Sequence, residues 1–571
     1  MRERRNGAAP GLSRRDLVHH ALVLAAAGLT APFAGSVAAA AKFAKTPFML
    51  GVASGDPTAT GVVLWTRLAL NLADGVRWGL SESAYQVDWA VRDLEAAGEP
   101  VVKRGTAIAA QRNAYAVHVE VTGLQPGRAY GYRFMAGGQE DGGITRTAPA
   151  PDATPDKLRF AFCSCAEYEF AWPYAYEFMA RDEPQFIVHL GDYIYEQTYD
   201  QYFRRDPIKP RVPRAGCEDV TTHGRVRELS FDRIGKIRTL SQYRRRYAEY
   251  KLDKHLQFAH RQCPFIVTWD DHEVDNDYAA DFAETHEEEG FAQRRINAYR
   301  AYFENLPIRL STLPVRNQRR RLYRHFDFGR LLRLCMLDER QYRSEQACAR
   351  KKLRGNGQVI ALADCPDIVP AVGADGKSRE MLGREQEQWL ASQLGTSNAV
   401  WNVLAQGVMM AHVDSQADCQ FPEVKTGPQL WTDGWSGYIA ARQRVIDLMD
   451  RHRAKNPIVL GGDIHSHFVN RILKDWKDPQ NSRAVAPEFV CTAISSNLRN
   501  LEPLKENNKG TVVDLDCRHH GYVRCDVTKD DFKVSHMRIT PDAFVGSIEQ
   551  AKAEVGLNYR VSAGDPEPRR V

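Results

Sequence analysis

Hydrophobic patterning divides the chain into two parts. From about residue 46 to residue 150, short stretches alternate apolar with polar residues, as in GVVLWTRL (61–68) and AYAVHVEVTGL (114–124). This period of two predicts strands, and the Gly, Pro and Asp residues between them predict turns. The piece LQPGRAYGYRF places a turn before a Tyr-rich strand, which is typical of a fibronectin-like sandwich. We therefore predict an N-terminal β-sandwich domain over 46–150.

After a Pro- and Ala-rich linker at 148–156, short apolar runs alternate with helical segments. The predicted strands are 158–162, 185–190, 264–269, 331–337, 401–407 and 457–462, and the predicted helices are 238–251, 289–304, 383–394 and 437–453. This alternation is the α/β pattern. It predicts a catalytic domain over 157–545, with a C-terminal tail over 546–571. Two polar stretches, 343–380 and 411–436, are predicted as long loops that cap a site.

The first 41 residues have the composition of an export signal. Five arginines precede an apolar stretch at 21–31, and small residues with Ala-x-Ala options follow near position 41. Arg14 and Arg15, after Ser13, resemble a twin-arginine signal, with a generic secretory signal as the alternative. The apolar stretch is too short to span a bilayer. We expect a periplasmic or secreted protein that uses the twin-arginine export machinery and has no transmembrane span.

The net charge and the number of cysteines restrict the function of the chain further. Charged residues make up 26% of the chain and the net charge is only +5, so we expect no specific nucleic-acid binding. There are 11 cysteines, and an odd number in an exported protein leaves at least one as a free thiol or a metal ligand. Cys348 and Cys365 flank a polar loop and could form a disulfide in an oxidising compartment.

Four of the predicted strands run directly into side chains that bind metals or transfer protons. The sequences that follow them are Cys-Ser-Cys at 163–165, GDYIYE at 191–196, DDHEVDN at 270–276 and GGDIHSH at 461–467. In open α/β sheets, sites form beyond the carboxyl ends of the strands. Each motif alone is also compatible with an ordinary turn or a solvated loop. Their joint occurrence at four strand ends favours one shared site.

The residue types predict phosphoryl transfer to water at two metals. A carboxylate must bridge such a pair, and Asp192 is the natural choice. Cys165, Tyr195 and His465 would supply thiolate, phenolate and imidazole, which makes iron(III) plausible in one pocket. Asp271 and Asp463 would supply oxygen alone, which favours Ca²⁺ or Mg²⁺ in the other.

The motif set closely resembles the alkaline phosphatase D (PhoD-like) family of metallophosphoesterases. The matching pieces are SCAEY, GDYIYE, TWDDHEVDN and GGDIHS, with LDERQYR at 337–343 and DGWSGYIAARQR at 433–444 among others, and they run from about 47 to about 525. The resemblance implies a β-sandwich followed by a four-layered calcineurin-like α/β sandwich. It also implies an exported phosphatase and phosphodiesterase that hydrolyses small phosphate mono- and diesters by metal-activated hydroxide. The cofactors would be Fe(III) and Ca²⁺, held by Cys165, Asp192, Tyr195, Asp271, Asp463 and His465.

Further residues receive expected roles around this centre. His272 is predicted as the catalytic group that protonates or stabilises the leaving alkoxide, with an orienting role as the alternative. Asp275, Asn276 and His467 are expected to bind metal or to lie behind the metal ligands, and Tyr193 and Glu196 to lie in the core or behind the ligands. His412 is expected to be structural. Arg204 or Arg205 is expected to bind the phosphate group of the substrate.

Two other functions remain compatible with the sequence. One is narrower chemistry on the same fold, such as a phospholipase D-type diesterase or a nucleotidase. The other is an exported binding protein without catalysis, with the β-sandwich as its working part. Hydrolysis assays on a monoester, a diester and a phospholipid distinguish these functions.

Overall fold

The computed structural model describes residues 42–200, 225–233, 235–285, 288–312, 315–316, 319–349, 357–373, 376–417, 427–452, 455–541 and 546–571. The predicted signal over 1–41 and the candidate phosphate ligands Arg204 and Arg205 lie outside these residues. Phe43–Val571 forms one compact unit, and the fold below is that of this unit.

Two large sheets form the centre of the molecule. The first has ten strands, in the order β25 (Arg569–Arg570), β24 (Lys552–Ser562), β23 (Asp531–Thr540), β22 (Gly521–Val527), β8 (Leu158–Cys163), β9 (Ile187–His189), β10 (Phe265–Val267), β1 (Val52–Thr58), β2 (Gly61–Arg67) and β5 (Ala116–Thr122). The second has seven, in the order β13 (Arg324–Phe328), β14 (Leu332–Met336), β16 (Trp401–Ala405), β18 (Pro457–Gly461), β20 (Ala484–Val490), β19 (His467–Leu473) and β21 (Val512–Asp516).

The central strands of both sheets are parallel. β8, β9 and β10 pair in parallel in the first sheet, and β14, β16, β18 and β20 do so in the second. The six strands predicted from apolar runs are β8, β9, β10, β14, β16 and β18, so each of these predictions is confirmed. Their near-continuous apolar sequences reflect burial on both faces, which parallel sheets require.

The two sheets pack face to face over one apolar core. Phe160 and Phe162 of β8 point into it together with Leu334 of β14, Val403 of β16 and Leu460 of β18. Ala161 and Cys163, which alternate with those phenylalanines, point to the opposite face. The period-two alternation of a strand therefore gives each sheet two buried faces.

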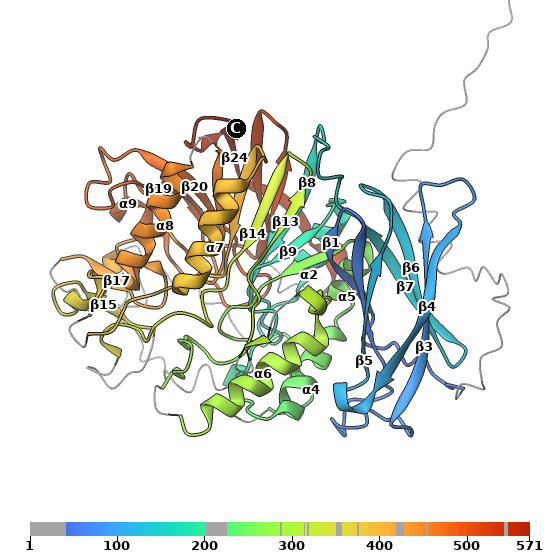
Figure 1. Ribbon diagram of the computed structural model, residues 1–571. Helices are drawn as coiled ribbons and strands as arrows, with labels where there is room; N and C mark the ends of the chain where they lie inside the picture. The colour runs from blue at the N-terminus through green and yellow to red at the C-terminus, as the bar shows by residue number, and fades with distance from the viewer. Residues whose placement is uncertain are drawn as a thin grey trace, which may run out of the picture. The chain divides into compact units, whose positions relative to one another are not determined.

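Helices cover the outer face of each sheet, as Figure 1 shows for α7 and α8 in front of the second sheet. The helices α2 (Tyr174–Arg181), α4 (Leu240–Lys251), α5 (Lys254–Gln262) and α6 (Phe291–Asn305) contribute to the core on the first sheet. The helices α7 (Gly383–Thr396) and α8 (Ile439–Arg451) pack on the second. The result is the expected four-layered α/β/β/α sandwich, and the four predicted helices are confirmed.

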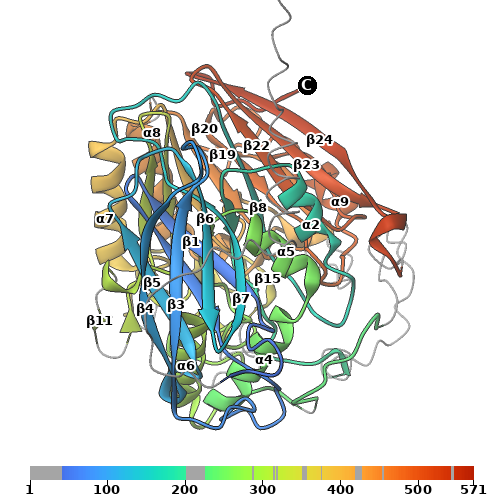
Figure 2. The ribbon, with the colours of Figure 1, turned by 90° about the vertical axis from the view of Figure 1, so that its right-hand side faces the viewer.

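The N-terminal β region shares a sheet with the catalytic region. A four-stranded sheet in the order β4 (Val101–Ala110), β3 (Ala84–Asp93), β6 (Ala129–Ala136) and β7 (Gln139–Arg146) packs over β1, β2 and β5 (Figure 2). β1 also pairs in parallel with β10, at Gly55 opposite Phe265. The predicted all-β region is therefore present, but three of its strands extend the ten-stranded sheet. The domain boundary predicted at residue 150 therefore separates two segments of the sequence, but strands from both segments belong to the ten-stranded sheet.

The segment expected as a C-terminal tail, 546–571, is instead part of the fold. It forms β24, which pairs with β23 over its whole length, and the short edge strand β25. The apolar residues Leu557, Tyr559 and Val561 alternate along β24 and enter the core between the sheets. The alternation of apolar and polar residues over 557–561 indicates a strand. The prediction of a C-terminal tail over 546–571 was therefore wrong.

Two further predictions concern a disulfide and a transmembrane span. Cys348 and Cys365 form a disulfide, as the sequence suggested. Among the described residues we find no helix that combines the length and apolar character required to cross a membrane.

Candidate active site

The carboxyl ends of four parallel strands bring the predicted residues to one edge of the sandwich. β8 leads to Cys165, β9 leads to Asp192 and Tyr195, and β10 leads to Asp271 and His272, all in the ten-stranded sheet. β18 of the seven-stranded sheet leads to Asp463 and His465. The two sheets are joined at this edge, where Ser164 pairs with Ala493 in an isolated parallel bridge. Side chains from both sheets therefore meet in one site.

A first group of donor atoms contains sulfur, nitrogen and oxygen. Cys165, Asp192 and His465 each present a ligand atom, and these atoms lie within 4.8 Å of one another. The Tyr195 hydroxyl reaches the same point, 3.0 Å from Asp192 Oδ2 and 3.2 Å from His465 Nε2. His465 Nδ1 lies 2.7 Å from the carbonyl oxygen of Asn497. Because a carbonyl can only accept, Nδ1 carries the proton and Nε2 is left to bind a cation.

A second group of donor atoms consists of carboxylates. One oxygen each from Asp270, Asp271 and Asp463 lies within 4.8 Å of the others. A third group joins Asp192 to Asp271 and His272 within the same limit. Asp192 thus belongs both to the group with Cys165 and to the group with Asp271. One carboxylate that borders two donor groups is the arrangement expected for a bridging ligand.

The backbone at these positions adopts a conformation that non-glycine residues rarely take. The φ angles are positive at Cys165 (61°), Asp192 (54°), Asp463 (67°) and His465 (56°). Each such residue costs of order 1–3 kcal/mol, and such residues cluster at functional sites. Gly191, with φ of 117°, precedes Asp192, and a Cβ there would lie 2.4 Å from Asp270 Cβ. Three tight strand-to-loop turns, after β8, β9 and β18, therefore aim these donors at one point.

Burial and mutual repulsion disfavour negative charge at Asp192, Asp463 and Cys165, whereas at Asp271 burial is outweighed by Arg340 and His272, which lower the pKa of that carboxyl. Burial, followed by the Asp271 carboxylate, raises the pKa of Asp192 well above its ordinary value. Burial, followed by Asp270, does the same to the pKa of Asp463. The pKa of Cys165 is also raised well above normal, by burial and then by Asp192. Burial and then Arg499 lower the pKa of His465 to about 3, which keeps this imidazole neutral.

The donors fit bound cations. Asp271 Oδ1 is buried and has no hydrogen-bond partner among the described residues, and Asp270 Oδ2 is in the same situation. A cation would satisfy such oxygens and favour the ionised forms of the acids around it. The first group offers thiolate, phenolate and imidazole, which suit a transition metal, whereas the second offers only oxygen, which suits Ca²⁺ or Mg²⁺.

Other predicted residues lie behind this cluster. Asp275 faces the cations Lys236 and Arg294, and the Asn276 amide nitrogen donates to Asp277 and Glu284. His467 accepts a hydrogen bond from the Thr492 backbone amide at Nδ1, and its Nε2 lies 3.2 Å from the Met537 carbonyl oxygen. Neither ring nitrogen of His467 is therefore left for a metal. His412 Nδ1 contacts Arg442, away from the donor groups.

Three contributions to the site were not predicted as site residues, and the first is Asp270, which belongs to the carboxylate group. Arg340 follows β14 and is fully buried, with Nε 2.5 Å from Asp270 Oδ1 and Nη2 3.7 Å from Asp271 Oδ1. The strand-end rule applied to the predicted strand 331–337 points to this arginine. The loop after β20 supplies Ser496, whose hydroxyl donates to the Tyr195 oxygen at 2.7 Å. Serine and asparagine in a loop give no comparable sequence signal.

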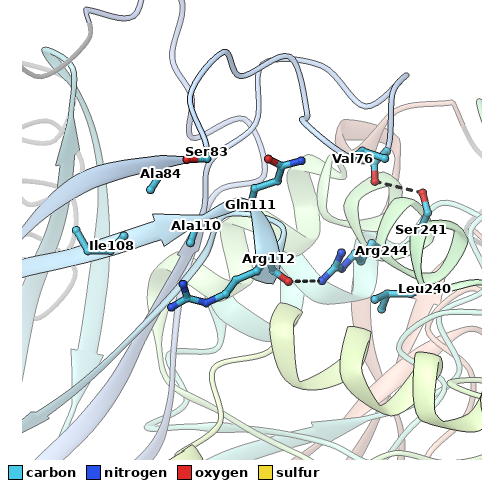
Figure 3. Close-up of a pocket in the computed structure, with 11 residues that line it drawn as sticks. Val76, Ser83, Ala84, Ile108, Ala110, Gln111, Arg112, Leu240, Ser241 and Arg244 are labelled. Atoms are coloured by element: carbon cyan, nitrogen blue, oxygen red, sulfur yellow. Dashed lines mark hydrogen bonds between the residues drawn. The ribbon is translucent and has the colours of Figure 1, made fainter.

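The donor cluster is separate from the pocket shown in Figure 3. That pocket has a volume of about 710 Å³ and lies between the β3–β4 region and the start of α4. Its lining includes Val76, Ile108 and Arg244, and none of the predicted site residues that the structure describes. It gives no support to any of the functions considered from the sequence.

Comparisons with known proteins agree with this fold. Alkaline phosphatase D of Bacillus subtilis (strain 168) is 37% identical over 542 residues, which cover 92% of this chain and 84% of the relative. A solved structure, described as that of PhoD, matches with a TM-score of 0.78 and 34% identity over 93% of each chain. Fold, donor groups and relatives together define a metal-dependent phosphatase.

The family follows from two sequence models. The PhoD-like phosphatase model matches residues 160–536, and the model of the N-terminal domain of PhoD-like phosphatases matches residues 34–149. The chain belongs to the PhoD-like phosphatase family and is a phosphoric ester hydrolase.

Proposed function

We propose that this phosphatase hydrolyses phosphate mono- and diesters at a dinuclear centre of Fe(III) and Ca²⁺. Cys165, Asp192, Tyr195 and His465 would hold the iron, and Asp192, Asp271 and Asp463 would hold the calcium. The observation that carries the proposal is the position of Asp192, which lies in one donor group with Cys165 and His465 and in another with Asp271. Anionic sulfur and oxygen donors stabilise a high oxidation state, and the all-oxygen group favours a hard divalent ion. When bound, the two cations would activate a water nucleophile and neutralise charge on the phosphate.

The chain's own side chains would position the reacting groups and supply a proton. The His272 backbone amide donates a hydrogen bond to Asp192 Oδ1, and the Tyr195 oxygen lies 3.0 Å from Asp192 Oδ2. The ring of His272 lies beside Asp192 and Asp271 and is 7% exposed. Burial opposes a charged ring, but Asp271, Asp192 and Glu196 outweigh it and raise the pKa of His272 well above its ordinary value. A protonated His272 suits the role of a general acid for the leaving oxygen.

Removal of the metals tests this proposal. Treatment with a chelator should lower hydrolysis of a chromogenic monoester and of a diester by at least about 100-fold, or about 2.7 kcal/mol of barrier. Ca²⁺ should restore both activities to protein that retains its iron. Hydrolysis that persists in metal-free protein would contradict a dinuclear centre. A phospholipid assayed in parallel separates the proposed function from narrower diesterase chemistry.

We also propose that the protein is exported through the twin-arginine machinery to the periplasm or the medium. The Arg14-Arg15 pair before an apolar stretch supports this route, and the Cys348–Cys365 disulfide suits an oxidising compartment. Replacing both arginines with lysine should leave the protein inside the producing cell with its signal uncut. Export of the double variant at the unchanged level would refute the route.

A further inference from the structure

The ring of His272 is held by a buried carboxylate. His272 Nδ1 lies 2.7 Å from Glu196 Oε2, and the Glu196 side chain has no exposed surface. Because a carboxylate can only accept, Nδ1 carries a proton. The ring also stacks on Tyr195, with centroids 4.0 Å apart and planes 27° apart. These contacts fix the plane of the ring and leave Nε2 as the nitrogen available for reacting groups.

Glu196 is in turn held by a buried cation. Lys236 Nζ lies 3.3 Å from Glu196 Oε1, and the lysine side chain is only 4% exposed. The backbone amide of Asn276 donates to the same oxygen at 3.2 Å. Both carboxylate oxygens of Glu196 are therefore occupied, one by His272 and the other by Lys236 and Asn276. A buried carboxylate with this many partners cannot turn without leaving a charge unpaired.

Lys236 is anchored by further acids and by helix α6. Its amine contacts Asp275 and lies 2.7 Å from Glu284 Oε2. Arg294 of α6 pairs with the same Asp275 at 2.9 Å. The network thus runs from α6, which packs in the core, through Asp275 and Lys236 to Glu196 and the His272 ring. Removing one partner from such a network is strongly unfavourable because the remaining charged groups stay buried without a partner.

We infer that Glu196 and Lys236 are positioning residues for proton transfer by His272. The inference rests on the proposed function. As a water-derived oxygen bonds to phosphorus, the bond between phosphorus and the leaving oxygen breaks, and its electron pair passes to the leaving oxygen. The Nε2 proton of His272 is transferred to the same oxygen, and the neutral ring then regains a proton from water. Glu196 keeps Nε2 directed at the leaving oxygen, and Lys236 holds Glu196 in place through its contact with Oε1.

Leaving groups of different basicity test the inference. An alkyl phosphate needs a proton on its leaving oxygen, whereas 2,4-dinitrophenyl phosphate does not. Glu196→Gln and Lys236→Met should lower kcat for the alkyl ester by about 10- to 100-fold, a fraction of the effect of a general acid. They should lower kcat for the dinitrophenyl ester by less than about threefold on the same scale. The iron and calcium content should stay at the wild-type level, and Lys236→Arg should restore most of the alkyl rate.

A matched control breaks a buried ion pair elsewhere. Glu304 of α6 pairs with Arg244 at 2.6 Å, and Glu304→Gln should change the two rates by the same factor. Equal slowing of both esters by Glu196→Gln and Lys236→Met, or no slowing, overturns the inference. His272→Gln separates a failure of the positioning role of Glu196 and Lys236 from a failure of the acid role of His272. If this variant discriminates between the esters and the others do not, only the positioning inference fails. If it does not discriminate either, the acid role in the proposed function fails.

Discussion

Replacement of Asp192 with asparagine is expected to abolish phosphatase activity while the fold remains intact. Asparagine keeps the shape of the side chain but offers one neutral oxygen, so it cannot bind a cation on each side. We expect kcat to fall by more than about 10³-fold, or about 4 kcal/mol of barrier. Steady-state kinetics on a monoester and on a diester measure this loss, which should be of the same size for both.

Thermal unfolding separates this effect from a loss of structure. In metal-free protein, burial and the neighbouring Asp271 disfavour the charged form of Asp192, which is why its pKa is raised. The neutral asparagine should therefore unfold at the same temperature as the metal-free parent, or higher. Asp152→Asn, at an exposed position in the linker, serves as the control and should keep full activity. Near-normal turnover in the Asp192 variant would exclude a bridging role.

Loss of the Tyr195 hydroxyl should remove the colour of the protein. A phenolate bound to Fe(III) gives a visible charge-transfer band, and Tyr195 is the tyrosine whose hydroxyl contacts both Asp192 and His465. Tyr195→Phe should reduce this band at least about tenfold while part of the iron stays bound. Cys165→Ser should lower iron occupancy, because a thiolate ligand is lost. Absorption spectra combined with iron analysis measure both changes.

The same turn contains a matched control for this experiment. Tyr193 is also buried, but its hydroxyl lies 2.8 Å from His260 Nε2 and accepts a hydrogen bond from Lys251 at 3.1 Å. Tyr193→Phe should therefore keep the colour and the iron. If the spectrum and iron content of Tyr195→Phe match those of the parent, Tyr195 is not an iron ligand and the first donor group needs another occupant.

Much of the fold could be predicted because two hydrophobic patterns are strong: the apolar–polar alternation of the N-terminal strands and the continuous apolar runs of the parallel strands. The parallel strands are apolar on both faces, so runs such as 457–462 indicated strands without ambiguity. The N-terminal strands were also recognised, but their sheet was not, because the pairing of Gly55 with Phe265 joins residues far apart in the sequence. Pairing between distant strands leaves no local signal.

The site residues that could be predicted are those that directly follow a predicted strand. Applied to four strands, the rule located the six proposed ligands, of which Cys165, Asp192, Asp271, Asp463 and His465 belong to the donor groups and Tyr195 adjoins them. It did not assign Arg340, although this residue follows a predicted strand, because an arginine among acids was not sought as part of a metal site. The partners of Glu196 could not be predicted, since Lys236 comes from an irregular segment.

Anomalous X-ray diffraction from crystals of the metal-loaded protein is the decisive test of the dinuclear centre. Data collected on both sides of the iron absorption edge should show one iron peak among Cys165, Asp192, Tyr195 and His465. A second peak that does not change at this edge should lie among Asp192, Asp271 and Asp463, with Asp192 in contact with both ions. A single peak, or iron bound by side chains outside this cluster, would contradict the dinuclear site.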